Sequence, residues 1–241
     1  LRHPGIAQLL DGGEADDGTP YLVMEFVEGQ RIDHWCAASA CNLRERVRLL
    51  LCIADALQAA HATLVIHRDL KPANILVDTH GQVRLVDFGI ARVLDAPMSS
   101  APATEPGERL MTLAYASPEQ IRGEPTGIAS DVYSLGVVAY ELLSGQPAHA
   151  SGCAGLTALV ASVCEHDPPA PSGVADETMR RQGMGRELDV VILKAMRKTA
   201  ADRYPTVAAL ADDLRRWQSR VPVEALRGDR WYLLRKRLQR S

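Results

Sequence analysis

Residues 65–77 read VIHRDLKPANILV, a polar segment between two short apolar runs. Burying charged and amide groups beside a core is costly unless each of them has a partner. The segment nevertheless carries His67, Arg68, Asp69, Lys71 and Asn74. This concentration of acid, base and amide groups predicts a chemical site that is held between two strands.

The composition is that of a soluble globular domain. The chain has 241 residues, of which 46% are hydrophobic and 24% charged, and its net charge is −3. These values allow a sizeable core and argue against nucleic-acid binding by the chain as a whole. The five cysteines form no CxxC pattern, which predicts reduced thiols in a cytosolic domain. No apolar run of about 20 residues and no signal peptide are visible.

Four strands are expected. Residues 6–10 and 21–27 each predict a strand, the second of them buried, with the turn formers of residues 11–20 between them. Residues 75–77 and 83–86 predict a hairpin.

Helices are expected in most of the remaining chain. Asn42 and Glu45 form the pattern of a capping box, and the apolar spacing after them predicts a helix buried on much of its girth. Residues 131–145 predict a central buried helix that ends at Gly145. Two further helices are expected over 188–195 and 207–217, and loops over 95–110 and 167–173.

The hairpin predicts how the polar groups converge. If its strands pair, Asn74 lies near Asp87, and Asp69 precedes Asn74 by only five residues. Such hard oxygen ligands suit Mg²⁺, which usually completes its coordination shell with phosphate oxygens. Lys71 adds a positive charge that would neutralise a transferring phosphoryl group. These residues therefore predict a site of phosphoryl transfer.

Several motifs resemble the eukaryotic-like protein kinase family, and the sequence is closest to those of bacterial Ser/Thr kinases. They are HRDLKPAN (67–74), DFG (87–89), SPE (117–119), DVYSLG (131–136) and ADRYP (201–205). The resemblance runs from Leu1 to about Val223 and implies an α+β, protein kinase-like fold. It implies a remnant of the N-lobe and hinge at 1–28, the helical C-lobe at 29–222 and a basic tail at 223–241.

The resemblance also implies a function, the transfer of the ATP γ-phosphoryl group to Ser or Thr hydroxyls of proteins. Asp69 resembles the catalytic base, and Asn74 and Asp87 resemble the ligands of Mg²⁺ and thus of the bound nucleotide. Lys71 resembles the lysine typical of Ser/Thr kinases. Thr112 resembles the threonine that contacts the catalytic Asp, although Met111 replaces the glycine that usually precedes it.

The adenine of ATP would bind at the hinge. YLVMEFVEG (21–29) resembles this segment, with Met24 as gatekeeper and with Glu25 and Val27 offering backbone groups to the base. Leu76 would lie under the adenine ring. Met24 and Leu76 would also suit a purely structural place in the core.

The remaining family positions are structural or regulatory. His67 resembles a packing residue between Phe88 and Asp131, and Gly89 completes the DFG turn. Glu119 resembles the acid that pairs with Arg203. Arg68 resembles the arginine that binds a phosphorylated loop residue, for which the candidates are Ser99, Ser100 and Thr104.

Some parts of the family pattern are missing. The first lysine of the chain is Lys71, and no GxGxxG occurs before it. Because the phosphate-anchoring lysine is absent and the chain begins at Leu1, we expect a piece of a longer kinase that transfers phosphate poorly alone. The alternative is a pseudokinase scaffold that binds protein partners. A small-molecule phosphotransferase fits less well, because such enzymes usually lack SPE and DLKPAN.

The tail allows two interpretations. Residues 227–241 combine arginines with Trp231 and Tyr232. They fit a solvated basic helix at the end of a domain. They also fit a juxtamembrane segment of a cytoplasmic domain, with a membrane anchor beyond Ser241.

Overall fold

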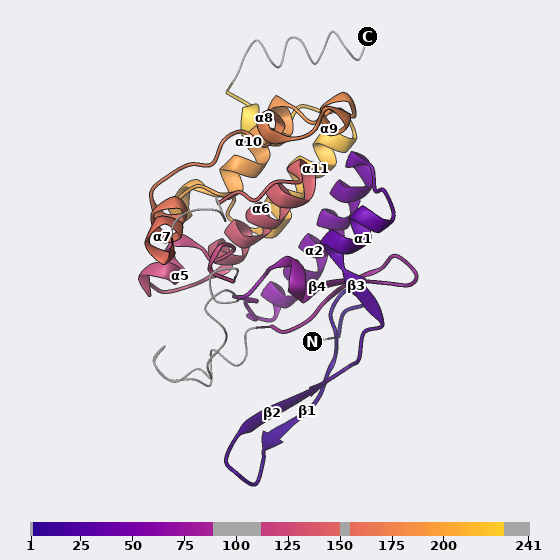
Figure 1. Ribbon diagram of the computed structural model, residues 1–241, viewed down its shortest axis with the longest axis vertical. Helices are drawn as coiled ribbons and strands as arrows, with labels where there is room; N and C mark the ends of the chain where they lie inside the picture. The colour runs from indigo at the N-terminus through magenta and orange to yellow at the C-terminus, as the bar shows by residue number, and fades with distance from the viewer. Residues whose placement is uncertain (1, 89–111, 150–154, 229–241) are drawn as a thin grey trace.

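The computed structural model describes residues 2–88, 112–149 and 155–228, which form a small β region and a larger helical region (Figure 1). The strands are β1 (Leu9–Glu14), β2 (Pro20–Met24), β3 (Gly29–Arg31), β4 (Ile75–Asp78) and β5 (Val83–Leu85). The longer helices are α2 (Leu43–Ala62), α6 (Ile128–Ser144), α7 (Leu156–Cys164), α10 (Arg186–Ala195) and α11 (Val207–Gln218). The shorter ones are α1 (Ile32–Ala38), η1 (Pro72–Asn74), α5 (Pro118–Arg122), α8 (Pro171–Val174), α9 (Glu177–Arg181), η2 (Ala200–Asp202) and η3 (Glu224–Leu226).

Helix α6 is the centre of the helical core. It packs against α2, α10 and α11, and Figure 1 shows it between α2 and α10. Tyr133, Leu135 and Tyr140 are among its fully buried side chains. The predicted central helix is confirmed, although it begins three residues earlier than expected. It ends at Gly145, whose φ of 72° is a left-handed conformation that glycine adopts without strain.

Helix α2 confirms the capping box. The Asn42 side chain accepts a hydrogen bond from the Glu45 amide at 3.0 Å, and the Glu45 carboxylate accepts one from the Asn42 amide at 2.7 Å. Two otherwise unpaired amides at the start of the helix are thereby satisfied. Apolar side chains are buried on more than one face of the helix, as its spacing predicted.

The predicted hairpin of β4 and β5 is also confirmed. The two strands pair antiparallel, with Ile75 opposite Leu85, and β3 pairs with the other edge of β4. The N-terminal segment is tied to this sheet by hydrogen bonds from Ala7 to the Leu85 carbonyl (2.9 Å) and from Leu85 to the Gly5 carbonyl (2.8 Å). Strand β5 also packs against α2, so the hairpin lies beside the helical region.

The first pair of strands differs from the prediction. The predicted strand 6–10 is wrong in its bounds, because β1 runs from Leu9 into the expected turn. The predicted buried strand 21–27 is also wrong, because β2 ends at Met24 and all its side chains except that of the half-buried Met24 are exposed. The physical reason is that, among the described residues, β1 and β2 pair with each other and with no other strand, in a two-stranded sheet that projects from the rest of the molecule (Figure 1).

The other differences lie in strand β3, which was not predicted, and in several helices, most of them short. The predicted loop 167–173 is wrong at its end, because α8 begins at Pro171, a residue suited to the first turn of a helix. The Ser172 amide and hydroxyl donate to the Asp189 carboxylate of α10 at 2.8 and 2.6 Å, which holds α8 in place. Helices α1, α5, α7 and α9 had no predicted counterpart.

The chain remains packed on the helical region as far as η3. The carboxylate of Asp213, which is fully buried, accepts hydrogen bonds from the Glu224 and Ala225 amides at 2.6 and 2.9 Å. Residues 229–241, which hold most of the predicted basic tail, lie outside the described residues. None of the helices in the described part of the chain is both long and apolar enough to cross a membrane.

The contact between α6 and α10 gives a first prediction. A Cβ atom added at Gly136 would meet Ala195 Cβ and Met196 Cγ, each at 2.9 Å, which is closer than carbon atoms pack. We expect Gly136→Val to lower the free energy of unfolding by about 1–3 kcal/mol, the usual cost of overpacking a core. Urea-induced unfolding measures this change.

Gly173→Ala in α8 is the matched control, because an added Cβ there meets no atom within 4 Å. We expect it to leave the unfolding midpoint nearly unchanged. Equal stability of Gly136→Val and the native chain would contradict the close packing of α6 against α10.

Candidate active site

The segment 67–69 is anchored to the first turn of α6. The buried carboxylate of Asp131 accepts hydrogen bonds from the His67 amide at 2.8 Å and from the Arg68 amide at 2.9 Å. His61 Nε2 lies 2.7 Å from the same carboxylate. Arg68 has a φ of 64°, an unfavourable conformation for a residue with a side chain, and these bonds help to hold it there.

His67 is a packing residue. Its ring is fully buried and lies 4.5 Å from the Phe88 ring, between centroids. Burial lowers the pKa of His67, so the imidazole is neutral near neutral pH. The expected link from Phe88 through His67 to Asp131 is therefore present, made by a ring contact and a backbone amide.

Asp69 is held by two neighbouring side chains. The Lys71 ammonium lies 2.9 Å from Asp69 Oδ2 and donates to the Thr112 hydroxyl at 3.3 Å. Asn74 Nδ2 donates to the Asp69 carbonyl at 2.8 Å and to Asp69 Oδ2 at 3.0 Å. These bonds fix the orientation of the carboxylate and bring together four residues that the sequence singled out.

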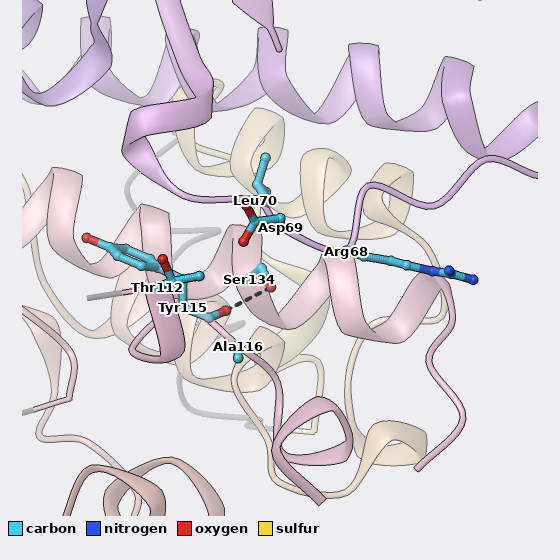
Figure 2. A pocket seen from close by; sticks show the side chains of 7 residues that line it. All are labelled: Arg68, Asp69, Leu70, Thr112, Tyr115, Ala116 and Ser134. Atoms are coloured by element: carbon cyan, nitrogen blue, oxygen red, sulfur yellow. Dashed lines mark hydrogen bonds between the residues drawn. The ribbon is translucent and has the colours of Figure 1, made fainter. Parts of the chain in front are cut away.

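A pocket opens beside this carboxylate. Figure 2 shows Asp69, Thr112 and Tyr115 around it, with the Arg68 side chain pointing away from the other three. The Ser134 hydroxyl of α6 donates to the Tyr115 carbonyl at 2.9 Å and so fixes one wall (Figure 2). The pocket is lined by Arg68, Asp69, Leu70, Thr112, Tyr115, Ala116 and Ser134. It can admit a small polar group to the oriented carboxylate.

Asn74 and Asp87 lie at one end of the β4–β5 hairpin. Asn74 directly precedes β4, Asp87 follows β5, and the Val86 amide donates to the Asn74 carbonyl at 3.0 Å. Since Asn74 Nδ2 is used on Asp69, its Oδ1 atom stays available as a ligand. Asp87 is exposed, with a φ of 54°.

This donor set fits Mg²⁺. An amide oxygen and a carboxylate are hard ligands, and Mg²⁺ commonly takes few protein ligands beside water and phosphate. Among residues 2–88, 112–149 and 155–228, no three His, Cys, Asp or Glu side chains form a metal-binding group.

The predicted hinge residues lie between β2 and β3. Met24 ends β2, and the Glu25 carboxylate pairs with Arg84 of β5. The Glu25 amide donates to the Gln8 carbonyl at 2.8 Å, so only its carbonyl remains for a ligand. Val27 and Leu76 are both partly buried, Val27 in the chain between the strands and Leu76 in β4.

The SPE segment is anchored by a buried ion pair. Arg203 donates to both carboxylate oxygens of Glu119, at 2.7 and 2.8 Å, and its side chain is fully buried. The Ser130 hydroxyl donates to Glu119 at 2.7 Å. Burial alone would raise the pKa of Glu119, but the hydrogen bonds from Arg203 and Ser130 outweigh it and hold the pKa at about 2. The pairing expected from the resemblance is present.

Two contributors were not recognised from the sequence. His61 received no role, although it contacts Asp131. Gln120 was also overlooked, although its Nε2 donates to the Arg68 carbonyl at 2.6 Å and joins the SPE segment to the 67–69 segment. Gln120 had one local signal, because Ser117 and Gln120 have the spacing of a capping box, which the structure contains. Gly89, Met111 and the three candidate phosphorylation sites lie outside the described residues.

Comparison with known proteins identifies relatives of this arrangement. A family model described as "Protein kinase domain" matches residues 1–207. The serine/threonine-protein kinase PknB of Mycobacterium leprae is 37% identical over 229 residues, which are 93% of this chain and 35% of that protein. PknA of Mycobacterium tuberculosis, also a serine/threonine-protein kinase, is 43% identical over 217 residues, 88% of this chain and 47% of that protein. The chain thus spans between a third and a half of the length of these relatives.

The ion pair of Glu119 and Arg203 gives a second prediction. Glu119→Gln leaves the buried guanidinium without a countercharge, and we expect a loss of about 3–5 kcal/mol in unfolding free energy. We expect Arg203→Met to cost a similar amount, and the double variant to cost clearly less than the sum. Urea-induced unfolding of all four proteins measures the coupling.

Glu177→Gln is the control for the ion pair, because Glu177 pairs with Arg181 on the exposed surface. Exposed pairs contribute little, so its stability should stay close to that of the native chain. Additive effects of Glu119→Gln and Arg203→Met would contradict a direct interaction between the two side chains.

The lowered pKa of Glu119 gives a third prediction. Because the folded pKa of about 2 lies below the usual 4.5, the unfolded chain binds the proton more readily in this window. The contribution of Glu119 is complete above pH 4.5 and is lost as the pH falls toward 2, about 3 kcal/mol in all. Urea-induced unfolding across this window should show a shallower pH dependence for Glu119→Gln, and an unchanged slope would contradict the assignment.

Proposed function

The chain belongs to the protein kinase domain family, and we propose that it is part of a serine/threonine-protein kinase that transfers the ATP γ-phosphoryl group to Ser or Thr hydroxyls of proteins. The observation that carries this proposal is that the Lys71 ammonium contacts both Asp69 and Thr112. It joins the candidate catalytic residue to the segment that leads into SPE. A pocket for a substrate hydroxyl lies between them.

Asp69 is the proposed catalytic residue. Its carboxylate would accept or orient the proton of the substrate hydroxyl, as the catalytic-loop aspartate does in kinases. The bonds from Lys71 and Asn74 restrict it to one orientation, which reduces the cost of aligning the reactants. Lys71 also places a positive charge beside the position where phosphoryl oxygens would carry negative charge.

Asn74 and Asp87 are the proposed ligands of Mg²⁺. The cation, when bound, would neutralise charge on the phosphates of ATP. The adenine would lie against Met24 and Leu76, with the Glu25 carbonyl and the Val27 backbone as hydrogen-bonding groups. Among the described residues, no hydrogen bond to the Val27 backbone competes with such a ligand.

We infer that this chain alone is impaired. Catalysis in phosphoryl transfer comes almost entirely from positioning and charge. The chain contains no lysine before Lys71 and therefore no counterpart of the lysine that grips the α- and β-phosphates.

Arg68 supports control by phosphorylation. Its side chain points away from the pocket (Figure 2), and its Nε is buried without a partner among the described residues. A phosphate on Ser99, Ser100 or Thr104 would offer that guanidinium a charged acceptor. Such signalling would take place in the cytoplasm, where ATP is available, and a membrane anchor beyond Ser241 stays a prediction.

A radiolabelled ATP transfer assay with Mg²⁺ tests the proposal. It compares this chain, an upstream-extended chain and the extended chain with Asp69→Asn. We expect label from the extended chain and a fall of about 10²–10⁴ in rate for Asp69→Asn, the range for a positioned acid–base group. Asp212→Asn is the matched control, because Asp212 is exposed on α11 and its ion-pair partner among the described residues is Arg215.

The other outcomes separate the alternatives. Equal rates for the short and extended chains would contradict the impairment of this chain. The absence of label from a folded extended chain, with a generic protein substrate present, would favour the pseudokinase scaffold. Equal losses in Asp69→Asn and Asp212→Asn would indicate a general effect of charge rather than a catalytic carboxylate.

A further inference from the structure

Helix α1 ends in a turn that brings two cysteines together. The Cys41 amide donates to the Cys36 carbonyl at 3.0 Å, and the Ala40 amide donates to the Ala37 carbonyl at 3.2 Å. Ala40 has a φ of 48°. These three features define a Schellman motif, in which the side chain after the left-handed residue usually contacts the side chain five positions earlier. Both of these positions are cysteine here.

The backbone of this turn limits the distance between the two residues. The 3.0 Å hydrogen bond and standard bond lengths keep the Cα atoms of Cys36 and Cys41 within about 7 Å of each other. Disulfides usually join Cα atoms that are about 4.4–6.8 Å apart. The turn therefore meets the main distance requirement for a bond between the two sulfur atoms.

The two thiols are buried next to each other and are free. Cys36 is 1% exposed and Cys41 is 3% exposed, and both belong to the main core. Burial, and then the neighbouring Cys41, raises the pKa of Cys36 to about 12. Burial also raises the pKa of Cys41, against an opposing effect of the nearby Arg46 and Arg48 charges. Both groups are thus protonated thiols at neutral pH.

The position of Cys41 is fixed from the other side as well. Arg46 donates to the Cys41 carbonyl at 3.0 Å and to the Leu142 carbonyl at the end of α6 at 2.6 Å. The next residue, Asn42, is the N-cap of α2. The cysteine pair therefore lies where α1, α2 and α6 meet.

We propose that Cys36 and Cys41 form a reversible intrachain disulfide when a peroxide oxidises the protein. Cys41 gives up its proton, its thiolate attacks one oxygen of hydrogen peroxide, and the O–O bond breaks. The leaving hydroxide takes up that proton, so Cys41 sulfenic acid and water result. Cys36 sulfur then attacks Cys41 sulfur, the S–S bond forms and a second water leaves. The two thiols lose two hydrogen atoms, and one peroxide is reduced to two waters.

Cys41 reacts first because it is the more exposed of the two residues, at 3% against 1% for Cys36. The high pKa of both thiols makes the reaction slow, since the thiolate is the nucleophile. The pair thus responds to strong or prolonged oxidation and withstands mild exposure. Once Cys41 is oxidised, the adjacent Cys36 intercepts it before a second peroxide arrives.

The bond would fasten the end of a helix that borders the candidate active site. Helix α1 packs against β3, β4 and η1, and η1 ends at Asn74. A disulfide at its last turn would hold α1 to the start of α2. This inference does not depend on the proposed kinase activity, because it concerns only the geometry of the turn.

The test uses the folded chain and one of its own tryptic peptides. Cleavage after Arg31 and Arg44 releases residues 32–44, which hold both cysteines and no other lysine or arginine. The protein is incubated with hydrogen peroxide while circular dichroism reports its fold. It is then alkylated, unfolded and digested with trypsin, and the mass of peptide 32–44 is measured by mass spectrometry. We expect a peptide that is lighter by two hydrogen atoms, carries no alkyl group and regains two alkylation sites after dithiothreitol.

Variants identify the partners of the bond. Cys52→Ser removes an exposed thiol of α2 and should leave the oxidised peptide unchanged. Cys36→Ser should abolish the two-hydrogen loss and leave Cys41 as a sulfenic or higher acid. The main measurement, the mass of peptide 32–44, is made on the chain without substitutions. A folding defect in Cys36→Ser would therefore not prevent the test.

Three results would overturn the proposal. In the first, both cysteines of peptide 32–44 remain alkylatable in the folded protein after Cys52 has been oxidised. In the second, Cys36 or Cys41 is joined to a different cysteine. In the third, the disulfide forms only in denaturant, which would show that the folded turn does not favour it.

Discussion

The buried carboxylate of Asp131 is the interaction on which the candidate site depends. A buried charge is unfavourable without compensating hydrogen bonds, and this one accepts them from the His67 and Arg68 amides and lies against His61. Because Asp131 belongs to the central helix, the segment before Asp69 takes its position directly from the best-packed part of the core. The strained backbone of Arg68 is tolerated for the same reason.

The second wall of the site depends on the same helix. Arg203 and Ser130 bind the Glu119 carboxylate, and Ser134 donates to the Tyr115 carbonyl. Because Ser130 and Ser134 belong to α6, the position of the SPE segment depends on this helix as well. Gln120 then joins the two walls through the Arg68 carbonyl. Two segments separated by about 50 residues are thus aligned by one helix.

Patterns within a few residues of sequence predicted those structural features that depend on interactions between neighbouring residues. The α2 capping box, the β4–β5 hairpin and the apolar girth of α6 follow from spacing within a few residues, and the structure contains all three. The exposure of β2 depends on which other strands lie beside it, which no spacing within β2 records. The roles of His61 and Gln120 likewise arise from partners 70 and 52 positions away, and the sequence gives no periodic signal for such contacts.

The projecting β1–β2 hairpin has a thermodynamic consequence for ligand binding. Its side chains are largely exposed, so opening of this ribbon loses little buried apolar area and leaves the helical core intact. A nucleotide bound as proposed, through the Val27 backbone just beyond the ribbon, would restrict that motion, and the lost conformational entropy would subtract from the binding free energy. Affinity at this hinge would therefore depend on how ordered the ribbon is before binding, and any contact that stiffens β1 and β2 would strengthen binding without touching the ligand.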